Sequence, residues 1–323
     1  MVNYLVVECI GGLTNRLMAL TSGMRLASYY NLGFKVCWEA ATECGAEFSE
    51  LFDNDFELVA ASERENYANG ASIGFGSAGW NKDPVLPKPT EGENFWLTTH
   101  GIITHSNEAR NRSFFPDSGV IFDVGRYMRI LRPSTLVLES ANRVKFTPQN
   151  TATLHIRRPY SRAVKISDGA HANEQRLYGS ITDDYFCGII EKMLAADEEL
   201  NVLLCTNSGD TQDCIKSRFA DKVIAYGKSS DALDTSQSSS ARDALVDLIL
   251  MSRTFGIVRQ VDTHFGLYAS LTNLTPNLVI IRQEEGEAEL GFLRYGENQA
   301  VEFDRSPKSL ERFCDKETNL LRY

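Results

Sequence analysis

The sequence predicts an α/β protein with parallel, doubly wound sheets in two domains. Short apolar runs alternate with amphipathic helical segments through the second half of the chain, and the same order recurs more loosely in the first half. The 323 residues suffice for two domains that each bury a core. The chain is 43% hydrophobic and 24% charged, a composition typical of soluble globular proteins.

The first half begins with VNYLVVECI, which predicts a strand, and continues with an apolar helical stripe from Leu13 to Ala27. GFKVCWEA predicts a second strand, and RPSTLVLESANRVKF (132–146) predicts a helix. Residues from about 60 to 90 are rich in Gly, Asn and Pro, which indicates a long loop or an inserted subdomain. We place the domain boundary near Pro148, giving domains 1–147 and 148–323.

The second half predicts strands at 151–158, 201–206, 222–227 and 277–283, and helices at 182–194, 210–220 and 241–253. Thr182 has the position and side chain of an N-cap. TFGIVRQV and THFGLYAS predict a further strand and helix, and SLERFCDKETNLL predicts a peripheral C-terminal helix. Residues 228–242 are polar and serine-rich and are interpreted as a loop.

Charge and cysteine content exclude several classes of protein. The net charge of −10 argues against a nucleic-acid partner, because such a surface needs a positive field. The seven cysteines are scattered without a C-x-x-C pair, which favours reduced thiols in the cytoplasm over disulfides or a zinc site. No apolar run is long enough to span a membrane, and the N-terminus predicts a strand rather than a signal peptide. The oligomeric state stays open.

GGLTNRL, residues 11–17, stands where the first strand becomes a helix. Such a turn exposes backbone N–H groups that can bind an anion. It can equally be a tight corner, because glycine is the residue that most easily adopts a positive φ. Gly11, Gly12, Asn15 and Arg16 are therefore candidate binding residues.

Polar residues also gather at the predicted strand ends of the second half, where open α/β sheets bind ligands. LHIRRPYSRAVK ends a strand with His155, Arg157 and Arg158, a basic cluster in an acidic chain. Guanidinium groups suit phosphate oxygens. Adjacent strand residues point to opposite faces, so we expect Arg157 to contact the ligand and Arg158 to brace the loop or lie in it. A solvated strand end is the alternative.

Two further junctions carry candidate residues. Thr206 and Asn207 end the strand NVLLCT, where they can bind a ligand or cap the next helix. Asp247 lies on the helix 241–253, and Thr263 and His264 open a later helix whose N–H groups can hold a phosphate. The alternatives are a cap at Thr263 and a structural histidine. Together the three junctions predict a site for a nucleotide diphosphate.

The order of these motifs resembles the fucosyltransferase superfamily, which includes the nodulation fucosyltransferase, α1,6- and α1,2-fucosyltransferases and protein O-fucosyltransferases. The resemblance rests on GGLTNRL, ECGAEFSELF, HIRR, ALVDLILMS and THFGLYAS, in this order over almost the whole chain. It implies a GT-B fold, in which two Rossmann-like domains face a central cleft. It also implies an inverting, metal-independent transfer of L-fucose from GDP-fucose to a glycan hydroxyl, without a cofactor.

The resemblance assigns roles by position. His155 and Asp247 would address the guanine, Arg157 the β-phosphate, and Thr263 the diphosphate. The turn at Gly12 and Asn15 would close over the sugar from the N-terminal, acceptor-side domain. The chain departs from the family pattern at Pro159-Tyr160, at Thr206-Asn207 and at 262–266, so a GDP-sugar other than GDP-fucose is an alternative donor.

Inverting transfer needs a carboxylate to take the proton of the acceptor hydroxyl. Asp168 and Glu174 lie in the loop after HIRR and are the candidates, with Asp168 favoured because SDGA predicts a turn. Glu8 in the N-terminal domain is the alternative. The Asp53-Asn54-Asp55 triplet resembles a metal-binding motif but is interpreted as a turn.

Other functions stay open on the sequence. The chain lacks a G-x-x-x-x-G-K-[ST] P-loop, which disfavours an ATPase or kinase of that class. It lacks G-x-G-x-x-G after the first strand, which weakens the case for a nucleotide-dependent oxidoreductase or epimerase. The altered motifs also allow a nucleotide-sugar binding protein without catalysis.

Overall fold

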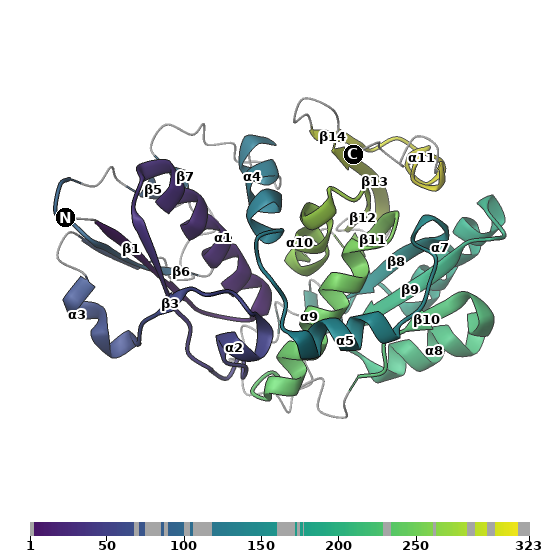
Figure 1. The fold of residues 1–323 in the computed structure, drawn as a ribbon. Helices are drawn as coiled ribbons and strands as arrows, with labels where there is room; N and C mark the ends of the chain where they lie inside the picture. The colour runs from purple at the N-terminus through teal and green to yellow at the C-terminus, as the bar shows by residue number, and fades with distance from the viewer. Residues whose placement is uncertain are drawn as a thin grey trace. The chain divides into compact units, whose positions relative to one another are not determined.

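The computed structural model describes residues 3–67, 71–74, 85–86, 90–99, 104–105, 118–159, 172, 175–176, 178–228, 234–260, 263–282, 288–295 and 301–315. The chain divides into two compact units (Figure 1). The first comprises Met1–Leu138 and Thr235–Leu245, and the second comprises Glu139–Asp234 and Val246–Tyr323. The domain limits expected from the sequence did not include the return of 235–245 to the first unit.

The returning segment is attached to the rest of the first unit by hydrogen bonds at Thr235. The Gly45 N–H donates to the carbonyl oxygen of Thr235 at 2.9 Å, and the Thr235 hydroxyl donates to the carbonyl oxygen of Thr42 at 2.8 Å. A Cβ on Gly45 would lie 1.9 Å from the carbonyl oxygen of Ser236, so only glycine fits this approach.

The first unit contains a parallel sheet in the order β3-β2-β1-β6-β4. Its strands are β1 (Tyr4–Cys9), β2 (Gly33–Cys37), β3 (Glu57–Leu58), β4 (Ala71–Gly74) and β6 (Phe95–Thr99). A separate pair is formed by β5 (Val85–Leu86) and β7 (Thr104–His105). The helices of this unit are α1 (Leu13–Tyr30), α2 (Phe48–Leu51), α3 (Arg64–Tyr67) and α4 (Ser118–Met128), with the 3₁₀ turn η1 (Ala61–Glu63). Helix α5 (Thr135–Arg143) begins in the first unit and ends in the second.

Packing in the first unit explains why β1 is continuous and apolar. Leu5, Val6 and Val7 are fully buried, as expected of a central parallel strand that is covered on both faces. Helix α1 packs closely on this strand at Gly23. A Cβ at that position would lie 2.3 Å from Cγ2 of Val7, so a larger residue would not fit there. Strand β6, with the fully buried Trp96, pairs with the other edge of β1, and the sequence had not predicted it.

The second unit contains a sheet in the order β10-β9-β8-β11-β12-β13-β14. The parallel strands are β8 (Thr151–Ile156), β9 (Asn201–Thr206), β10 (Val223–Ala225), β11 (Gly256–Gln260) and β12 (Asn277–Arg282). An antiparallel hairpin of β13 (Ala288–Tyr295) and β14 (Val301–Asp304) extends the sheet. The helices of this unit are α7 (Asp183–Ala196), α8 (Gly209–Phe219), α10 (His264–Asn273) and α11 (Ser309–Cys314), with 3₁₀ turns η2 (Pro148–Asn150) and η3 (Ala220–Lys222). Helix α9 (Ser238–Ser252) begins in the first unit and continues into the second from Val246.

The strand order determines where a ligand site belongs in this sheet. From β8 the chain first runs outward to β9 and β10, and it then returns to the other side of β8 as β11 and continues to β12. The sheet therefore has its topological switch point between β8 and β11, and ligands of open α/β sheets bind at the carboxyl ends of the strands at such a point. In the part of the chain that is described, no helix is both long and apolar enough to cross a bilayer.

Candidate functional site

His155 is the last but one residue of β8, beside the switch point, and is 6% exposed. Its ring stacks on Phe265 with centroids 5.3 Å apart, and its Nδ1 atom has no hydrogen-bond partner among the described residues. Burial, followed by the charges of Lys228, Arg157 and Arg259, lowers its pKa to about 3. The imidazole is therefore neutral, and every charged group that shifts its pKa is a cation.

Gln260 ends β11 on the other side of the switch point and is 2% exposed. Its Oε1 accepts a hydrogen bond from the backbone N–H of Arg157 at 2.8 Å. Its Nε2 is buried and has no partner within the described residues. A buried amide that lacks a partner is costly, because its lost hydration is not replaced. Gln260 and His155 therefore both place a buried polar atom at the switch point that a bound ligand could hydrogen-bond.

Helix α10 begins immediately after this junction, at His264. The buried Thr263 is its N-cap residue, and the Thr263 hydroxyl donates to the carbonyl oxygen of Gln260 at 2.7 Å rather than capping the helix. Burial, and secondarily the charge of Arg259, lowers the pKa of His264 to about 4. Gly266 lets the helix approach the strands, because a Cβ there would lie 2.9 Å from Cδ of Arg259 and 3.3 Å from Nδ1 of His155.

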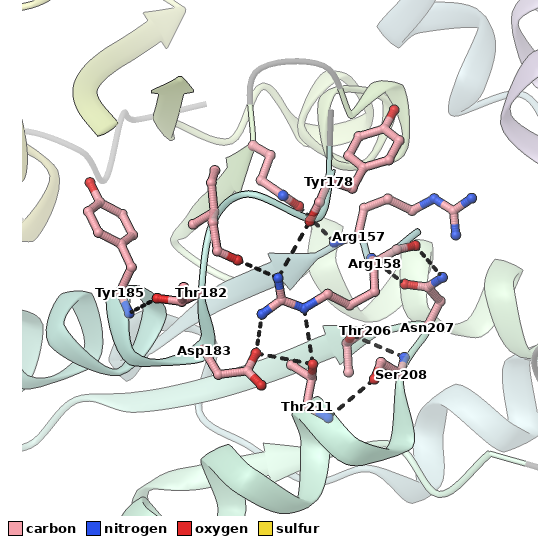
Figure 2. A network of polar contacts seen from close by, with 12 residues as sticks. Arg157, Arg158, Tyr178, Thr182, Asp183, Tyr185, Thr206, Asn207, Ser208 and Thr211 are labelled. Carbon is pink, nitrogen blue, oxygen red and sulfur yellow. Dashed lines mark hydrogen bonds and ion pairs between the residues drawn. The ribbon is translucent and has the colours of Figure 1, made fainter. Parts of the chain in front are cut away.

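Arg157 and Arg158 follow β8, and Figure 2 shows their side chains leaving the backbone in different directions. The Arg158 guanidinium is enclosed by protein: Nε donates to the Thr211 hydroxyl at 3.1 Å, Nη1 to the Ile181 carbonyl oxygen, and Nη2 forms an ion pair with Asp183. Arg158 therefore ties the end of β8 to the starts of α7 and α8. Arg158 thus braces this loop. Strand β8 ends at Ile156, so both arginines lie beyond the strand, which the sequence predicted to run over 151–158.

The Arg157 side chain takes a different direction from that of Arg158 (Figure 2). Its guanidinium carbon lies 5.6 Å from the centroid of the Tyr178 ring, and its side chain is half-buried. It lies close enough to lower the pKa of His155. A planar guanidinium beside the switch point is suited to bidentate binding of phosphate oxygens.

Thr206 and Asn207 lie at the end of β9 and are used mainly by the protein itself. The Asn207 side chain accepts from the backbone N–H of Arg158 at 2.7 Å and donates to its carbonyl oxygen at 2.9 Å (Figure 2). The Thr206 hydroxyl accepts from the backbone N–H of Ser208 at 3.2 Å, and Ser208 caps α8 by accepting from Thr211. These contacts fix the loop between β9 and α8.

Asp247 lies on α9, is 4% exposed, and forms an ion pair with Lys228, whose Nζ is 2.5 Å from Oδ2. Lys228 Nζ also donates to the carbonyl oxygen of Thr206 at 2.5 Å. The Cys205 thiol is fully buried beside Asp247, and burial and the Asp247 charge raise its pKa well above the usual value, so the thiol stays protonated. Asp247 is thus held by Lys228, which follows β10, and lies beside Cys205 of β9.

The GGLTNRL turn belongs to the first unit, where its arginine holds the backbone in place. Gly11 has φ +81°, which explains a glycine at this position, whereas Gly12 has φ −70° and is the N-cap residue of α1. Arg16 is 2% exposed and donates from Nε to the Gly11 carbonyl oxygen and from Nη1 to that of Glu39, both at 2.8 Å. The half-buried Asn15 side chain lies against Gly11, 3.0 Å from the place of a Cβ.

Glu8 precedes this turn at the carboxyl end of β1. Its Oε2 accepts from Trp96 Nε1 at 2.9 Å and from the Thr98 hydroxyl. Both donors lie on β6, so Glu8 stands at the switch point of the first sheet, between β1 and β6.

Asp168 and Glu174 lie outside the residues that the structure describes. The Asp53-Asn54-Asp55 triplet forms a loop that joins the segment at Arg132: the Asp53 N–H donates to the Arg132 carbonyl oxygen at 2.8 Å, and Asn54 Oδ1 accepts from the Arg132 N–H at 2.6 Å. Within the described residues, no group of three or more His, Cys, Asp or Glu side chains is placed to bind a metal ion.

Sequence reasoning missed three residues of the site: Lys228, Arg259 and Gln260. Arg259 and Gln260 end the run GIVRQ, and two polar residues at the end of a buried strand were a detectable signal. Lys228 opened a serine-rich stretch that was interpreted only as a loop. Arg259 is 1% exposed, and its Nε donates to Asn277 Oδ1 at 3.0 Å.

Comparison with known proteins gives no match to a family model and no significant match to a curated protein. Solved structures do match. The crystal structure of NodZ α-1,6-fucosyltransferase soaked with GDP-fucose matches with a TM-score of 0.58 and 14% identity, over 95% of this chain and 100% of that chain. Fucosyltransferase NodZ from Bradyrhizobium matches with a TM-score of 0.57, 14% identity and the same coverage.

A plant enzyme has the same fold. A mutant of FUT1 from Arabidopsis thaliana, solved in complex with GDP, matches with a TM-score of 0.54 and 12% identity, over 90% of this chain and 74% of that chain. The chain therefore has the GT-B fold of the fucosyltransferases, as the motif order implied.

Proposed function

We propose that this protein is a glycosyltransferase that moves a sugar, L-fucose in the first instance, from a GDP-sugar to a hydroxyl of a glycan. The observation that carries the proposal is the switch point of the second sheet. A buried, neutral His155 with an unsatisfied Nδ1 lies there among three cations, Lys228, Arg157 and Arg259. Lys228 is paired with Asp247, and the two arginines remain beside His155. Arginines at the ends of parallel strands suit a nucleotide diphosphate. The NodZ and FUT1 structures with the same fold were solved with GDP-fucose or GDP, which supports the choice of nucleotide.

Each part of the donor has a partner in the proposal. Arg157 binds the β-phosphate, and the first N–H groups of α10, after Thr263, add donors at a helix N-terminus. Asp247 and His155 bind the guanine. Arg157 contributes more in the transition state than in the ground state, because negative charge grows on the diphosphate oxygen as its bond to the sugar breaks.

The proposed reaction is an inverting displacement. The acceptor oxygen forms a bond to the anomeric carbon while the bond from that carbon to the β-phosphate oxygen breaks, and GDP leaves. A carboxylate receives the hydroxyl proton, and Asp168 and Glu174 remain the candidates. Arginine and backbone N–H groups balance the leaving charge in this proposal, so transfer needs no divalent cation.

The test is a panel of nucleotide sugars, with binding measured by thermal stabilisation and transfer measured with and without EDTA. Stabilisation by GDP and GDP-sugars, with transfer that EDTA leaves unchanged, supports the proposal. Loss of transfer in EDTA overturns the metal-free mechanism. Binding of GDP-sugars without transfer to any glycan assigns a nucleotide-sugar binding protein, and preferential binding of NAD assigns an oxidoreductase.

The two candidate bases are compared directly. Asp168→Asn or Glu174→Gln removes the proton acceptor with little change in size, so the variant of the true base loses transfer and still binds GDP. Unchanged transfer in both variants excludes both residues as the base.

A further inference from the structure

Lys228 lies three residues after β10, and its ammonium group joins three elements of the second unit. Nζ is 2.5 Å from Oδ2 of Asp247 on α9 and 2.5 Å from the carbonyl oxygen of Thr206 at the end of β9. Its charge also lowers the pKa of His155 on β8, which shows that the ammonium lies near that ring. The Lys228 side chain is 18% exposed and that of Asp247 is 5% exposed.

The pair places a hydrogen-bond donor directly beside an acceptor. An ammonium only donates, and an ionised carboxylate only accepts. A 2.5 Å separation and the low exposure of Asp247 fix these two groups relative to each other more firmly than in a surface ion pair. A ligand edge that matches the pair must present an acceptor next to a donor.

The nucleobases differ in the order of hydrogen-bond donors and acceptors along the edge that would face this pair. Guanine presents the acceptor O6 beside two donors, the N1–H and the 2-amino group, which matches Lys228 followed by both oxygens of Asp247. Adenine and cytosine present an amino group where the ammonium stands, so two donors would face each other. Uracil matches at O4 and N3–H but points its O2 acceptor at the carboxylate. The pair therefore favours guanine, then uracil, over adenine and cytosine.

We propose that Lys228 is a specificity-determining residue that reads the O6 atom of guanine, while Asp247 accepts from N1–H and the 2-amino group. This inference rests on the proposed function, because it concerns the base of the same nucleotide. Lys228 also keeps the buried Asp247 carboxylate compensated, so its loss weakens binding in general as well as selectivity. The experiment must separate these two effects.

The experiment compares the affinities of GDP, 6-thio-GDP and IDP by calorimetry, at a slightly acidic pH at which the thio base keeps its N1 proton. 6-Thio-GDP replaces O6 with a weaker acceptor, and IDP lacks only the 2-amino group. We expect the native protein to prefer GDP over 6-thio-GDP by about tenfold, the effect of weakening one charge-assisted hydrogen bond. We expect a comparable preference for GDP over IDP.

Lys228→Met is expected to weaken GDP binding and to bring the GDP to 6-thio-GDP ratio close to one, while the GDP to IDP ratio is kept. Lys228→Arg keeps a donor and retains both ratios. Lys222→Met is the matched control, because Lys222 lies at the opposite end of β10, where it donates to the carbonyl oxygen of Glu198, and it leaves both ratios unchanged.

Two results overturn the inference while leaving the proposed function standing. One is a native protein that binds GDP and 6-thio-GDP equally. The other is a Lys228→Met variant in which all three affinities fall by the same factor, which would assign Lys228 a structural role only. A native protein that does not bind GDP overturns the proposed function and this inference with it.

Discussion

Alanine substitution of the adjacent residues Arg157 and Arg158 is expected to have opposite effects: Arg158→Ala should lower stability, and Arg157→Ala should lower activity. Arg158 is held by Thr211, Ile181 and Asp183, and its side chain is 13% exposed. Removing one partner of a buried ion pair costs about 3–5 kcal/mol. Asp183 is 30% exposed and can be rehydrated, so we expect about 3 kcal/mol, the lower end of that range.

Arg158→Ala should therefore lower the melting temperature of the second unit by roughly 6–12 °C, at 2–4 °C for each kcal/mol in a unit of this size. Arg157→Ala should cost less than about 1 kcal/mol. It loses a contact of the cation–π type with Tyr178 but keeps the backbone N–H bond to Gln260. Its kcat should instead fall on the order of a hundredfold, because a preorganised donor to the leaving diphosphate is lost.

The assay is urea or thermal unfolding of each purified variant, together with kcat for sugar transfer at a temperature where both are folded. Arg157→Lys should restore little activity, because an ammonium lacks the planar pair of donors. If both alanine variants show the same small losses of stability and activity, the two arginines form a solvated strand end and the assignment is wrong.

Two further predictions concern stability. Gly11→Ala should lower the free energy of unfolding by about 1–2 kcal/mol, because alanine is strained at φ +81°. Gly12→Ala, at φ −70°, should change it by less than about 0.5 kcal/mol. Equal melting temperatures of the two variants would refute the strain. His155 and His264 have pKa values lowered to about 3 and about 4, below the ordinary 6.5, so the unfolded chain binds more protons between these values. The stabilisation from the two neutral histidines should be complete above pH 6.5 and fall as the pH drops below it. In urea titrations, His155→Gln should reduce the slope of the unfolding free energy against pH near pH 5 by about 1.4 kcal/mol per pH unit. An unchanged slope would show that His155 is protonated in the folded state.

Alternating apolar runs and helical stripes predicted most of the second sheet from sequence, because its parallel strands are buried on both faces. Thr153 and Leu154 in β8, for example, are both fully buried. The hairpin of β13 and β14 was missed, because AELGFLRY mixes charged residues with apolar ones and follows the last α/β repeat. Strand β6 was missed because FWLTT is short and follows an irregular segment.

The site was harder to predict than the fold, because side-chain partners are set by neighbours in space. HIRR indicated a basic strand end, and the period of a strand indicated that only one arginine would face a ligand. Nothing local indicated that Asn207 would bind the Arg158 backbone or that Lys228 would reach Asp247, since both contacts cross between strands and helices that are distant in sequence. The structural role of Arg16 could not be predicted from the sequence either, because its acceptors are backbone carbonyl oxygens.

The measurement that tests the central claim most directly is transfer of labelled sugar from GDP-β-L-fucose to a panel of glycan acceptors in the presence of EDTA. The product is analysed by NMR for the configuration at the anomeric carbon. The account predicts a labelled glycan with an α-linked fucose, formed by the native protein and reduced on the order of a hundredfold by Arg157→Ala. A β-linked product, or the absence of labelled glycan with every acceptor, would contradict it.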